Sequence, residues 1–191
     1  MRTPKREALG RLINLLNEKL GLGIELKKED VSEIRSNGWL SGMLDADGNF
    51  NVVIQEQKGR IARIRGYCRL ELRRNYHRES VEGKRSYLEI MMKISEYLGV
   101  NVIGRRRSKG DLSYESYIVM TSSELSRERL NKYLEDYPLR SSKYWDHKDW
   151  KEILRMVKEG EHRKEEGLKK CKGLKKGMNK GRKEISWRHL Q

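Results

Sequence analysis

The sequence predicts an α+β fold in which one helix precedes a unit of order αββαββα and two further helices follow that unit. Apolar residues recur at helical spacing in some segments and alternate strictly with polar residues in others, which separates expected helices from expected strands. Glycine and proline mark several of the boundaries between these segments. With 191 residues, the chain is long enough for one domain with appendages and a substantial core.

The composition points to a polyanionic partner. The net charge is +15, and 37% of the residues are charged. A field of this sign favours nucleic acid or an anionic membrane surface, although a basic soluble protein without such a partner is the plainer interpretation. Cys68 and Cys171 lack CxxC spacing, so neither a disulfide framework nor a zinc site is expected. No signal peptide or membrane span is apparent, and we expect a soluble protein in a reducing compartment.

The N-terminal third predicts two helices and a connector. Thr3 and Pro4 fit an N-cap and a first helical position. A helical stripe follows, made of Leu9, Leu12, Ile13, Leu16 and Leu20. Gly21 ends this helix, and a polar connector continues to about residue 36. Asn37 then caps a short helix that Gly48 ends.

Two strands follow the short helix. In the first, Phe50, Val52 and Ile54 point to one side. The second strand is longer and has an arginine-rich face, formed by Arg63, Arg65, Tyr67, Arg69, Glu71 and Arg73. Its other face is apolar and is formed by Ile64, Gly66, Cys68, Leu70 and Leu72. This alternation predicts one buried and one exposed face.

The remaining elements repeat the helix and strand patterns. Ser86 begins a helix that Gly99 ends, with an inner side formed by Leu88, Met91, Ile94 and Leu98. Strands at about 102–107 and 112–120 flank a turn. Ser123 caps a helix that runs to about Tyr137, before Pro138. From Lys143 the pattern indicates two helices, marked by Trp150, Ile153, Leu154 and Val157 and by Leu168, Cys171, Leu174 and Met178.

The stretch WLSGMLDADGNF, residues 39–50, combines small residues with an acidic tip. Gly38, Gly42 and Ala46 share one helical face, where a second helix could approach closely. Asp45 and Asp47 lie at the helix C-terminus, where the dipole disfavours carboxylates, and this indicates either a hard divalent cation or a structural cap. Two such helices side by side would build a paired-carboxylate site for phosphodiester hydrolysis. Because the chain has one copy of the stretch, a second would come from elsewhere.

These residues resemble a known family. Leu40 to Gly48 is similar to the LAGLIDADG motif of homing endonucleases, from which it departs at Ser41, Met43 and Leu44. The αββαββα order also resembles that family, as does the run from Tyr137 to Leu139 with Lys143 ahead of a helix containing Trp150. The ending, from His162 to Arg182, is similar to the tail of organellar intron-encoded members. The resemblance covers roughly residues 37–182.

The resemblance implies a domain organisation and an activity. Residues 1–36 would form an N-terminal helix and connector. Residues 37–142 would form the LAGLIDADG core with a four-stranded antiparallel DNA-binding saddle, and residues 143–191 a basic helical extension. The implied activity is that of a site-specific double-strand DNA endonuclease, a phosphodiester hydrolase that uses Mg²⁺ or Mn²⁺ at a site formed by two motif helices. Maturase action on intron RNA, or nucleic-acid binding without catalysis, is the alternative.

The resemblance also implies roles for individual residues. Asp47 would bind metal together with the carbonyl of Ala46. Lys143 matches a basic residue near the cleaved phosphate, with a plain surface lysine as the competing interpretation. Arg74 stands where the family often has a glutamine near the active site, which leaves open a weakened catalyst. The interface between motif helices would contain Gly38, Ser41, Gly42, Asp45 and Ala46, with Asp45 supporting the helix end.

The expected DNA-binding residues combine a predicted strand face with the saddle of the family. Arginine pairs with guanine, and asparagine or glutamine with adenine, in the major groove. The candidates are Asn51, Gln55, Gln57, Arg63, Arg65, Tyr67, Arg69, Arg73, Arg105 and Arg107. Arg106 and Lys109 add positive charge. A basic ending should contact phosphates; it consists of Lys169, Lys170, Lys172, Lys175, Lys176, Lys180, Arg182 and Lys183.

The expected partners are double-stranded DNA and a second LAGLIDADG domain, from a homodimer or a separate N-terminal half. Intron RNA is an additional candidate, and no membrane partner is expected. Resemblance to organelle-encoded proteins suggests a mitochondrion or chloroplast. The four histidines (His77, His147, His162 and His189) are scattered and show no ligand spacing.

Overall fold

The computed structural model describes residues 4–25, 32–75, 86–183 and 186–190. Its main elements are α1 (Pro4–Leu20), α2 (Trp39–Asp47), β1 (Gly48–Gln55), β2 (Arg63–Arg73), α3 (Leu88–Leu98), β3 (Val102–Lys109), β4 (Leu112–Thr121), α4 (Glu124–Asp136), α5 (Lys143–Lys158) and α6 (Glu165–Gly177). This order confirms the α+β prediction. The proposed cap at Thr3 and the residue His77 lie outside the described residues. None of the described helices is long and apolar enough to cross a membrane.

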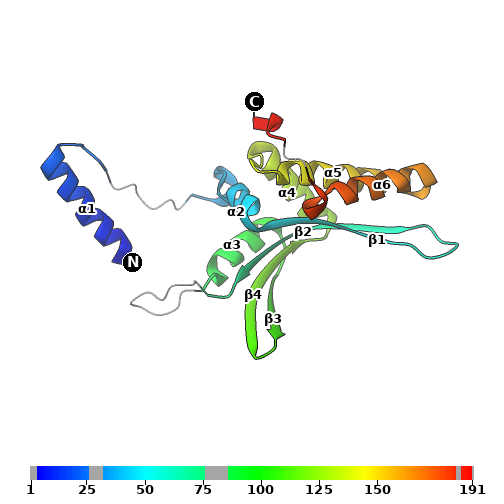
Figure 1. Ribbon diagram of the computed structural model, residues 1–191, viewed down its shortest axis with the longest axis horizontal. Helices are drawn as coiled ribbons and strands as arrows, with labels where there is room; N and C mark the ends of the chain where they lie inside the picture. The colour runs from blue at the N-terminus through cyan, green and yellow to red at the C-terminus, as the bar shows by residue number, and fades with distance from the viewer. Residues whose placement is uncertain (1–3, 26–31, 76–85, 184–185, 191) are drawn as a thin grey trace.

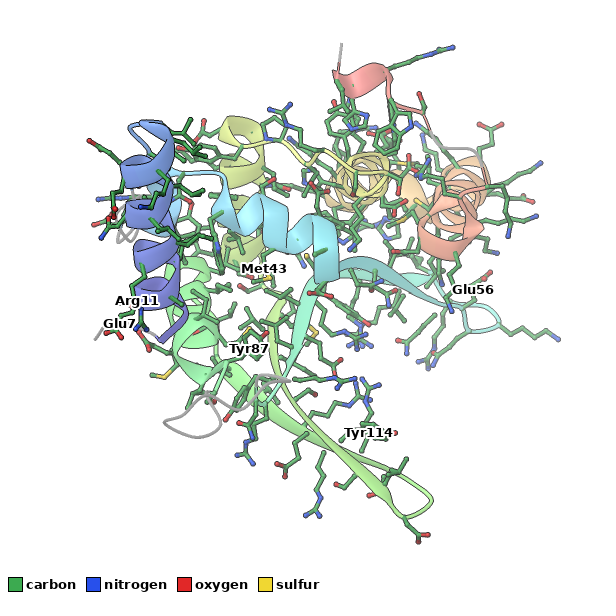
Figure 2. The ribbon with its side chains drawn as sticks, turned by 60° about the vertical axis from the view of Figure 1, so that its left-hand side comes forward. Glu7, Arg11, Met43, Glu56, Tyr87 and Tyr114 are labelled. Atoms are coloured by element: carbon green, nitrogen blue, oxygen red, sulfur yellow. The ribbon has the colours of Figure 1, made fainter. Side chains whose placement is uncertain are left out.

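The four strands form one antiparallel sheet in the order β1-β2-β4-β3. Phe50 lies opposite Cys68 in the first pair of strands, and Cys68 lies opposite Thr121 in the central pair. In the outer pair, Arg105 lies opposite Ser116. The sheet is strongly curved, and its two hairpins diverge (Figure 1). Figure 2 places Glu56 at the β1–β2 end and Tyr114 on the β3–β4 hairpin, with many side chains on the sheet between them.

Helices α2 to α6 supply the apolar residues that cover one face of this sheet. Burial along β2 alternates, with Ile64, Gly66, Cys68, Leu70 and Leu72 buried as the sequence predicts. The largest fully buried side chains come from the sheet and from four helices: Leu40, Phe50, Met91, Ile94, Leu130, Tyr133, Trp150, Ile153 and Met156. Residues of α5 and α6 therefore share the core of the preceding unit. The division of the chain into three segments stays a prediction.

Two helical stripes differ from the expected pattern. Leu88 begins α3 but leaves 37% of its surface exposed, because the helix turns this position away from the sheet; the inner side is formed by Met91, Ile94, Ser95 and Leu98. Helix α1 stands apart from the other helices in Figure 1. Its stripe is mostly exposed at Leu9, Leu12 and Leu20, and Ile13 is buried.

A C-terminal clasp joins the start of β1 to α5. The clasp consists of Asn179 and Arg182, which bind residues far away in the sequence. The amide nitrogen Nδ2 of Asn179 donates to the Phe50 carbonyl (2.9 Å), and Asn49 Nδ2 donates to Asn179 Oδ1 (3.2 Å). Buried Asp146 accepts from the Asn179 backbone N–H (3.1 Å) and from Arg182 Nε (2.9 Å). Asn179 adopts φ 53°, a conformation that asparagine tolerates better than most residues.

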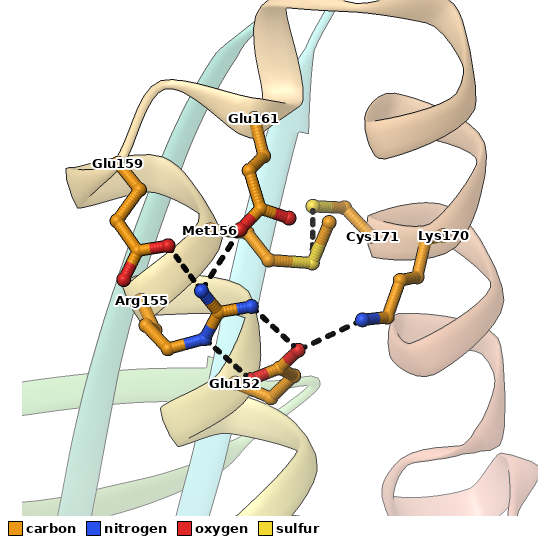
Figure 3. A network of polar contacts seen from close by, with 7 residues as sticks. All are labelled: Glu152, Arg155, Met156, Glu159, Glu161, Lys170 and Cys171. Atoms are coloured by element: carbon orange, nitrogen blue, oxygen red, sulfur yellow. Dashed lines mark hydrogen bonds and ion pairs between the residues drawn. The ribbon is translucent and has the colours of Figure 1, made fainter.

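Helices α5 and α6 are linked by apolar and ionic contacts (Figure 3). Glu152 accepts from Arg155 Nε (2.8 Å) and from Lys170 Nζ (2.9 Å), so it connects the two helices. Arg155 also pairs with Glu159 and with Glu161. Exposed ion pairs of this kind contribute little each. The apolar residues between the helices, including buried Cys171, are therefore the main attachment.

We predict that Gly66→Ala destabilises the fold, because α5 crosses the sheet at this glycine. An added Cβ would lie 2.9 Å from Trp150 Nε1 and 2.9 Å from a Leu154 methyl carbon. Overpacking of this kind costs about 1–3 kcal/mol. Gly104→Ala is the matched control, since nothing lies within 4 Å of the position that a Cβ would take at this strand glycine. Urea denaturation should show a lower midpoint for Gly66→Ala, and equal midpoints would contradict this account of the packing.

Buried His147 should make folding pH-dependent. Its Nε2 lies 2.8 Å from Asn131 Oδ1, and burial, helped by the charge of Lys151, lowers its pKa to about 4. The unfolded chain then binds more protons between about pH 6.5 and 4, so the free energy of unfolding falls as the pH falls, by about 3 kcal/mol in total. Denaturation of His147→Gln across this range should show a shallower dependence. An unchanged slope in the variant would exclude His147 as the cause.

Candidate active site and nucleic-acid interface

The C-terminus of α2 is capped by a lysine from α5. Lys143, the first residue of α5, donates from Nζ to the carbonyls of Ala46 (2.8 Å) and Leu44 (3.2 Å). The last carbonyls of a helix lack partners within the helix, and an ammonium group satisfies them and suits the negative end of the dipole. Burial lowers the pKa of Lys143, an effect that the charges of Asp47 and Asp45 oppose. The structure thus brings Lys143 to the tip of the motif helix, and its role beside a cleaved phosphate stays a prediction.

The two aspartates of the motif have different surroundings. Asp45 accepts hydrogen bonds from the backbone N–H of Arg140 (2.7 Å) and of Ser141 (3.1 Å), and from Ser141 Oγ (2.6 Å). Asp47 is exposed and has no hydrogen bond or ion pair among the described residues. The carboxylate of Asp45 is therefore engaged within the chain, whereas that of Asp47 is available to a ligand.

The motif helix presents two distinct faces. Ser41 is buried: its N–H donates to Tyr133 Oη (3.2 Å), and its hydroxyl donates to the Pro138 carbonyl (3.2 Å). Ser41 and Asp45, four residues apart, thus face the α4–α5 segment of their own chain. This differs from the expectation that they face a second motif helix. Gly42 and Ala46 are exposed, and nothing lies within 4 Å of a Cβ at Gly42.

Gly38 lies next to Tyr137 of the same chain. A Cβ added at Gly38 would lie 3.5 Å from the Tyr137 ring. Of the five expected interface residues, Gly42 and Ala46 are the ones whose surroundings leave most room for another helix. Contact with a second domain at this face stays a prediction.

The tip of α2 fits part of a site for a hard cation. The carboxylate of Asp47 and the carbonyl of Ala46 are oxygen ligands of the kind that Mg²⁺ prefers. Among the described residues, no group of three or more His, Cys, Asp or Glu side chains could hold a metal ion. The described residues therefore provide half of a carboxylate site at most. The Ala46 carbonyl is already bonded to Lys143, a cation from the chain itself.

Arg74 is not placed with the other two catalytic candidates. Its Nε donates to Tyr117 Oη (3.0 Å), and its Nη1 pairs with Glu115 (2.9 Å), both on β4. Since Gly48 lies opposite Leu70, Arg74 is four residues further along the strand, roughly 13 Å from that point. By strand alternation, Arg74 also lies on the same side of the sheet as Leu72, which is the side that the helices cover. The expectation that Arg74 joins the site is therefore not supported by its contacts.

The open face of the sheet holds the expected DNA-binding strand residues. Strand alternation places on it Asn51, Gln55, Arg63, Arg65, Tyr67, Arg69, Arg73, Arg105 and Arg107. Asn51 Nδ2 donates to Tyr67 Oη (3.0 Å), and Arg65 Nη2 donates to Gln55 Oε1 (2.9 Å). Gln57 lies beyond the end of β1. Arg106 points to the opposite face from Arg105 and Arg107, and it donates to Ser113.

Glu71 makes contacts on the open face that the sequence alone did not reveal. It lies on the open face among the arginines, and Ser116 Oγ donates to it (2.7 Å). Arg107 Nη2 lies 2.9 Å from both of its oxygens. The alternation of β2 places Glu71 on this face, but the contacts with Arg107 and Ser116 depend on the pairing of β2 with β4 and of β4 with β3.

The basic ending includes side chains that bind within the chain. Lys170 pairs with Glu152, and Lys172 pairs with Glu56 at the β1–β2 hairpin. Arg182 belongs to the C-terminal clasp, where its side chain is 20% exposed and pairs with Asp146 and Asp149. Arg182 therefore has a structural role, contrary to the expected phosphate contact. Lys169, Lys175, Lys176 and Lys180 are exposed.

This fold and motif identify the class of the protein. Residues 40–154 match the family model described as LAGLIDADG endonuclease, which is more than half of the chain. The chain therefore belongs to the LAGLIDADG endonuclease family, as the resemblance of the motif indicates.

Curated relatives of the chain are encoded in introns. The intron-encoded DNA endonuclease aI3 of Saccharomyces cerevisiae is 34% identical over 215 residues, which cover 100% of this chain and 52% of the relative. The probable intron-encoded endonuclease 3 of Neurospora crassa is 29% identical over 155 residues, which cover 78% of this chain and 26% of the relative. The chain thus spans about half the length of the first of these relatives, and less of the second.

Solved structures show the same fold. The LAGLIDADG meganuclease I-CpaMI, bound to uncleaved DNA, has a TM-score of 0.55 and 27% identity, over 75% of this chain and 44% of that chain. The homing endonuclease I-TnaI has a TM-score of 0.57 and 20% identity, over 74% of this chain and 86% of that chain. The α+β architecture with its four-stranded sheet is therefore that of homing endonucleases.

We predict that the two aspartates of the motif differ in their effect on stability. Asp45→Ala leaves the N–H groups of Arg140 and Ser141 without their acceptor and should cost about 1–3 kcal/mol. Asp47→Ala removes an exposed carboxylate at a helix C-terminus and should change stability by about 0.5 kcal/mol or less. Urea denaturation of both variants measures the difference. Equal losses would show that Asp45 does not hold the α4–α5 segment.

Proposed function

We propose that this chain is one half of a site-specific, metal-dependent endonuclease that cuts double-stranded DNA. The observation that carries the proposal is the exposed carboxylate of Asp47 at the tip of the motif helix, beside the ammonium group of Lys143. An available anion near a hydrogen-bonded cation suits a phosphodiester, since one can hold a metal ion and the other can bind phosphate oxygen. Family membership supports nuclease chemistry in particular.

The proposed cofactor is Mg²⁺ or Mn²⁺. Asp47 would hold it through its carboxylate, and the Ala46 carbonyl would contribute the lone pair that its hydrogen bond from Lys143 leaves open. When bound, such an ion neutralises phosphate charge and makes a water molecule more acidic. Lys143 would add positive charge beside the phosphate that is cut, and Asp45 would keep the helix tip in place through Arg140 and Ser141.

A second LAGLIDADG domain is the proposed partner. The described residues contain one exposed motif aspartate, and a paired site needs another. The exposed Gly42 and Ala46 give a second helix room to pack closely. The second domain is either a second copy of this chain or a separate N-terminal half.

DNA recognition is proposed for the open face of the sheet. Amide side chains of β1 and arginines of β2 and β3 share this face, and both kinds of side chain can make bidentate contacts with bases in the major groove. The exposed lysines of α6 would bind phosphates, which adds affinity that depends on salt concentration. Intron-encoded relatives, among them an uncharacterized cox1 intron-2 protein of Schizosaccharomyces pombe, support an organellar origin, with the mitochondrion as the proposed compartment.

We predict that Asp47→Asn abolishes cleavage and leaves DNA binding intact, because the amide cannot supply the charge that holds the cation. The measurement is cleavage of a randomised duplex library with Mg²⁺, with and without a separately supplied N-terminal half of a relative. Asp136→Asn makes the same change at an exposed residue at the end of α4, so it is the control and should cut normally.

Cleavage by Asp47→Asn at the normal rate would make the assignment of the metal ligand wrong. A symmetric recovered site would show that two copies of this chain act together, and an asymmetric site would favour a separate half. Preference for structured intron RNA over duplex DNA would instead favour the maturase alternative.

A further inference from the structure

Glu71 is the single acidic side chain that the four strands, which lie within the described residues, place on the open face. The same face carries six arginines, namely Arg63, Arg65, Arg69, Arg73, Arg105 and Arg107. A carboxylate on a surface that meets a polyanion is repelled by it and weakens association. Its presence among these arginines therefore indicates a compensating role.

The contacts of Glu71 bring together side chains from three strands. Arg107 of β3 places Nη2 2.9 Å from both carboxylate oxygens, and Ser116 of β4 donates from Oγ at 2.7 Å. Arg105 Nη1 lies 3.6 Å away, and Arg69 Nε lies 3.9 Å away. The Glu71 side chain is 21% exposed, so its carboxylate is more shielded from water than the arginines around it.

This arrangement leaves part of Arg107 available to a ligand. A guanidinium group has five N–H donors on three nitrogens, and Glu71 engages one nitrogen of Arg107. Its Nε and Nη1 have no hydrogen bond among the described residues. An arginine held in one orientation can present its free Nη1 to a base edge without first losing its rotamer freedom. An arginine without such a hold would turn to the nearest phosphate, which carries no sequence information.

We propose that Glu71 is a positioning residue for base recognition: it holds Arg107, with Arg105 and Arg69, in the orientation that reads guanine and keeps these arginines from phosphates. The inference rests on the proposed DNA recognition by the open face. Glu71 would thus lower the affinity of the chain for DNA of any sequence and raise its discrimination between sequences.

The other end of the same face provides an internal comparison. There Arg65 donates to Gln55, a neutral side chain, at 2.9 Å. Among the described residues, Glu71 forms its ion pairs with Arg69, Arg105 and Arg107, and Arg65 is not one of its partners. Removing the charge of Glu71 should therefore alter recognition on the side of β3 and leave recognition by Arg65 as it is.

The test is binding of Glu71→Gln to a set of duplexes that differ by one base pair from the sequence that the unaltered chain selects. Arg107→Ala and Arg65→Ala identify the base pairs that each arginine reads. At the Arg107 base pairs, Glu71→Gln should lose discrimination by about fivefold or more. At the Arg65 base pairs, discrimination should not change. Binding to unrelated duplex should tighten, with the slope of log K against log salt steeper by about one.

Two further variants separate positioning from net charge and from folding. Glu124→Gln makes the same charge change on α4, where Glu124 pairs with Lys158, and should not alter discrimination. Ser116→Ala keeps the charge of Glu71 and removes one of its donors, so it should shift discrimination in the same direction by a smaller factor. It carries the test if Glu71→Gln does not fold.

Full discrimination at the Arg107 base pairs in Glu71→Gln, or an equal loss in Glu124→Gln, would overturn the inference. Uniform weakening at all base pairs would also overturn it, because that pattern indicates damage to the sheet. If the unaltered chain shows no sequence preference, the proposed DNA recognition by the open face is wrong, and the role of Glu71 falls with it. If the unaltered chain has a preference that Glu71→Gln retains in full, only the role of Glu71 is wrong.

Discussion

Hydrogen bonds in both directions between the tip of α2 and the start of α5 set the geometry on which the candidate site depends. Lys143 donates to the last carbonyls of α2, and Asp45 accepts from the backbone ahead of α5. Each element supplies what the other lacks, since a helix C-terminus needs donors and the segment before α5 needs acceptors. Asp47 lies one residue beyond Ala46 and is left as the free carboxylate. The exposed aspartate therefore stands on a support that is bonded from two sides.

The same helix α5 connects this tip to the sheet. Trp150 packs against Phe50 with a ring-centroid distance of 5.6 Å, and Gly66 of β2 lets the helix approach closely. Interiors packed at this density transmit displacement, because a side chain has no empty volume to move into. The position of Lys143 relative to the open face is thus fixed by the contact between α5 and strands β1 and β2. A change in that contact alters both the tip and the orientation of the face that carries the arginines.

Much of the fold is predictable because its signals are local. The alternation in β2 fixes which arginines share a face, and Ser123 caps α4 through its bond to the Ser126 N–H. The motif identifies α2 and its two aspartates from twelve consecutive residues. These features depend on sequence neighbours, and a pattern of period two or a cap at one position is sufficient to find them.

The remaining features depend on contacts between distant segments. Ser41 turns inward because Tyr133 and Pro138, more than ninety positions later, supply its partners. In the sequence, Arg182 does not differ from the other basic residues of the ending, and only the structure shows that it pairs with Asp146. The expected place of Arg74 rests on resemblance to the family, which does not show that Tyr117 and Glu115 hold the side chain on β4. Spacing along the chain contains no information on these partners.

The C-terminal clasp has a consequence for the order in which the protein matures. The motif helix is synthesised early, but Asn49 and Phe50, directly after it, acquire their partner only when Asn179 has been made. Contacts of such long sequence separation form late in folding, since the intervening chain must first be ordered. A nascent or prematurely terminated polypeptide therefore carries the aspartates before their surroundings are complete. This delay makes the ordered surroundings of the motif aspartates depend on synthesis of the distant segment that contains Asn179.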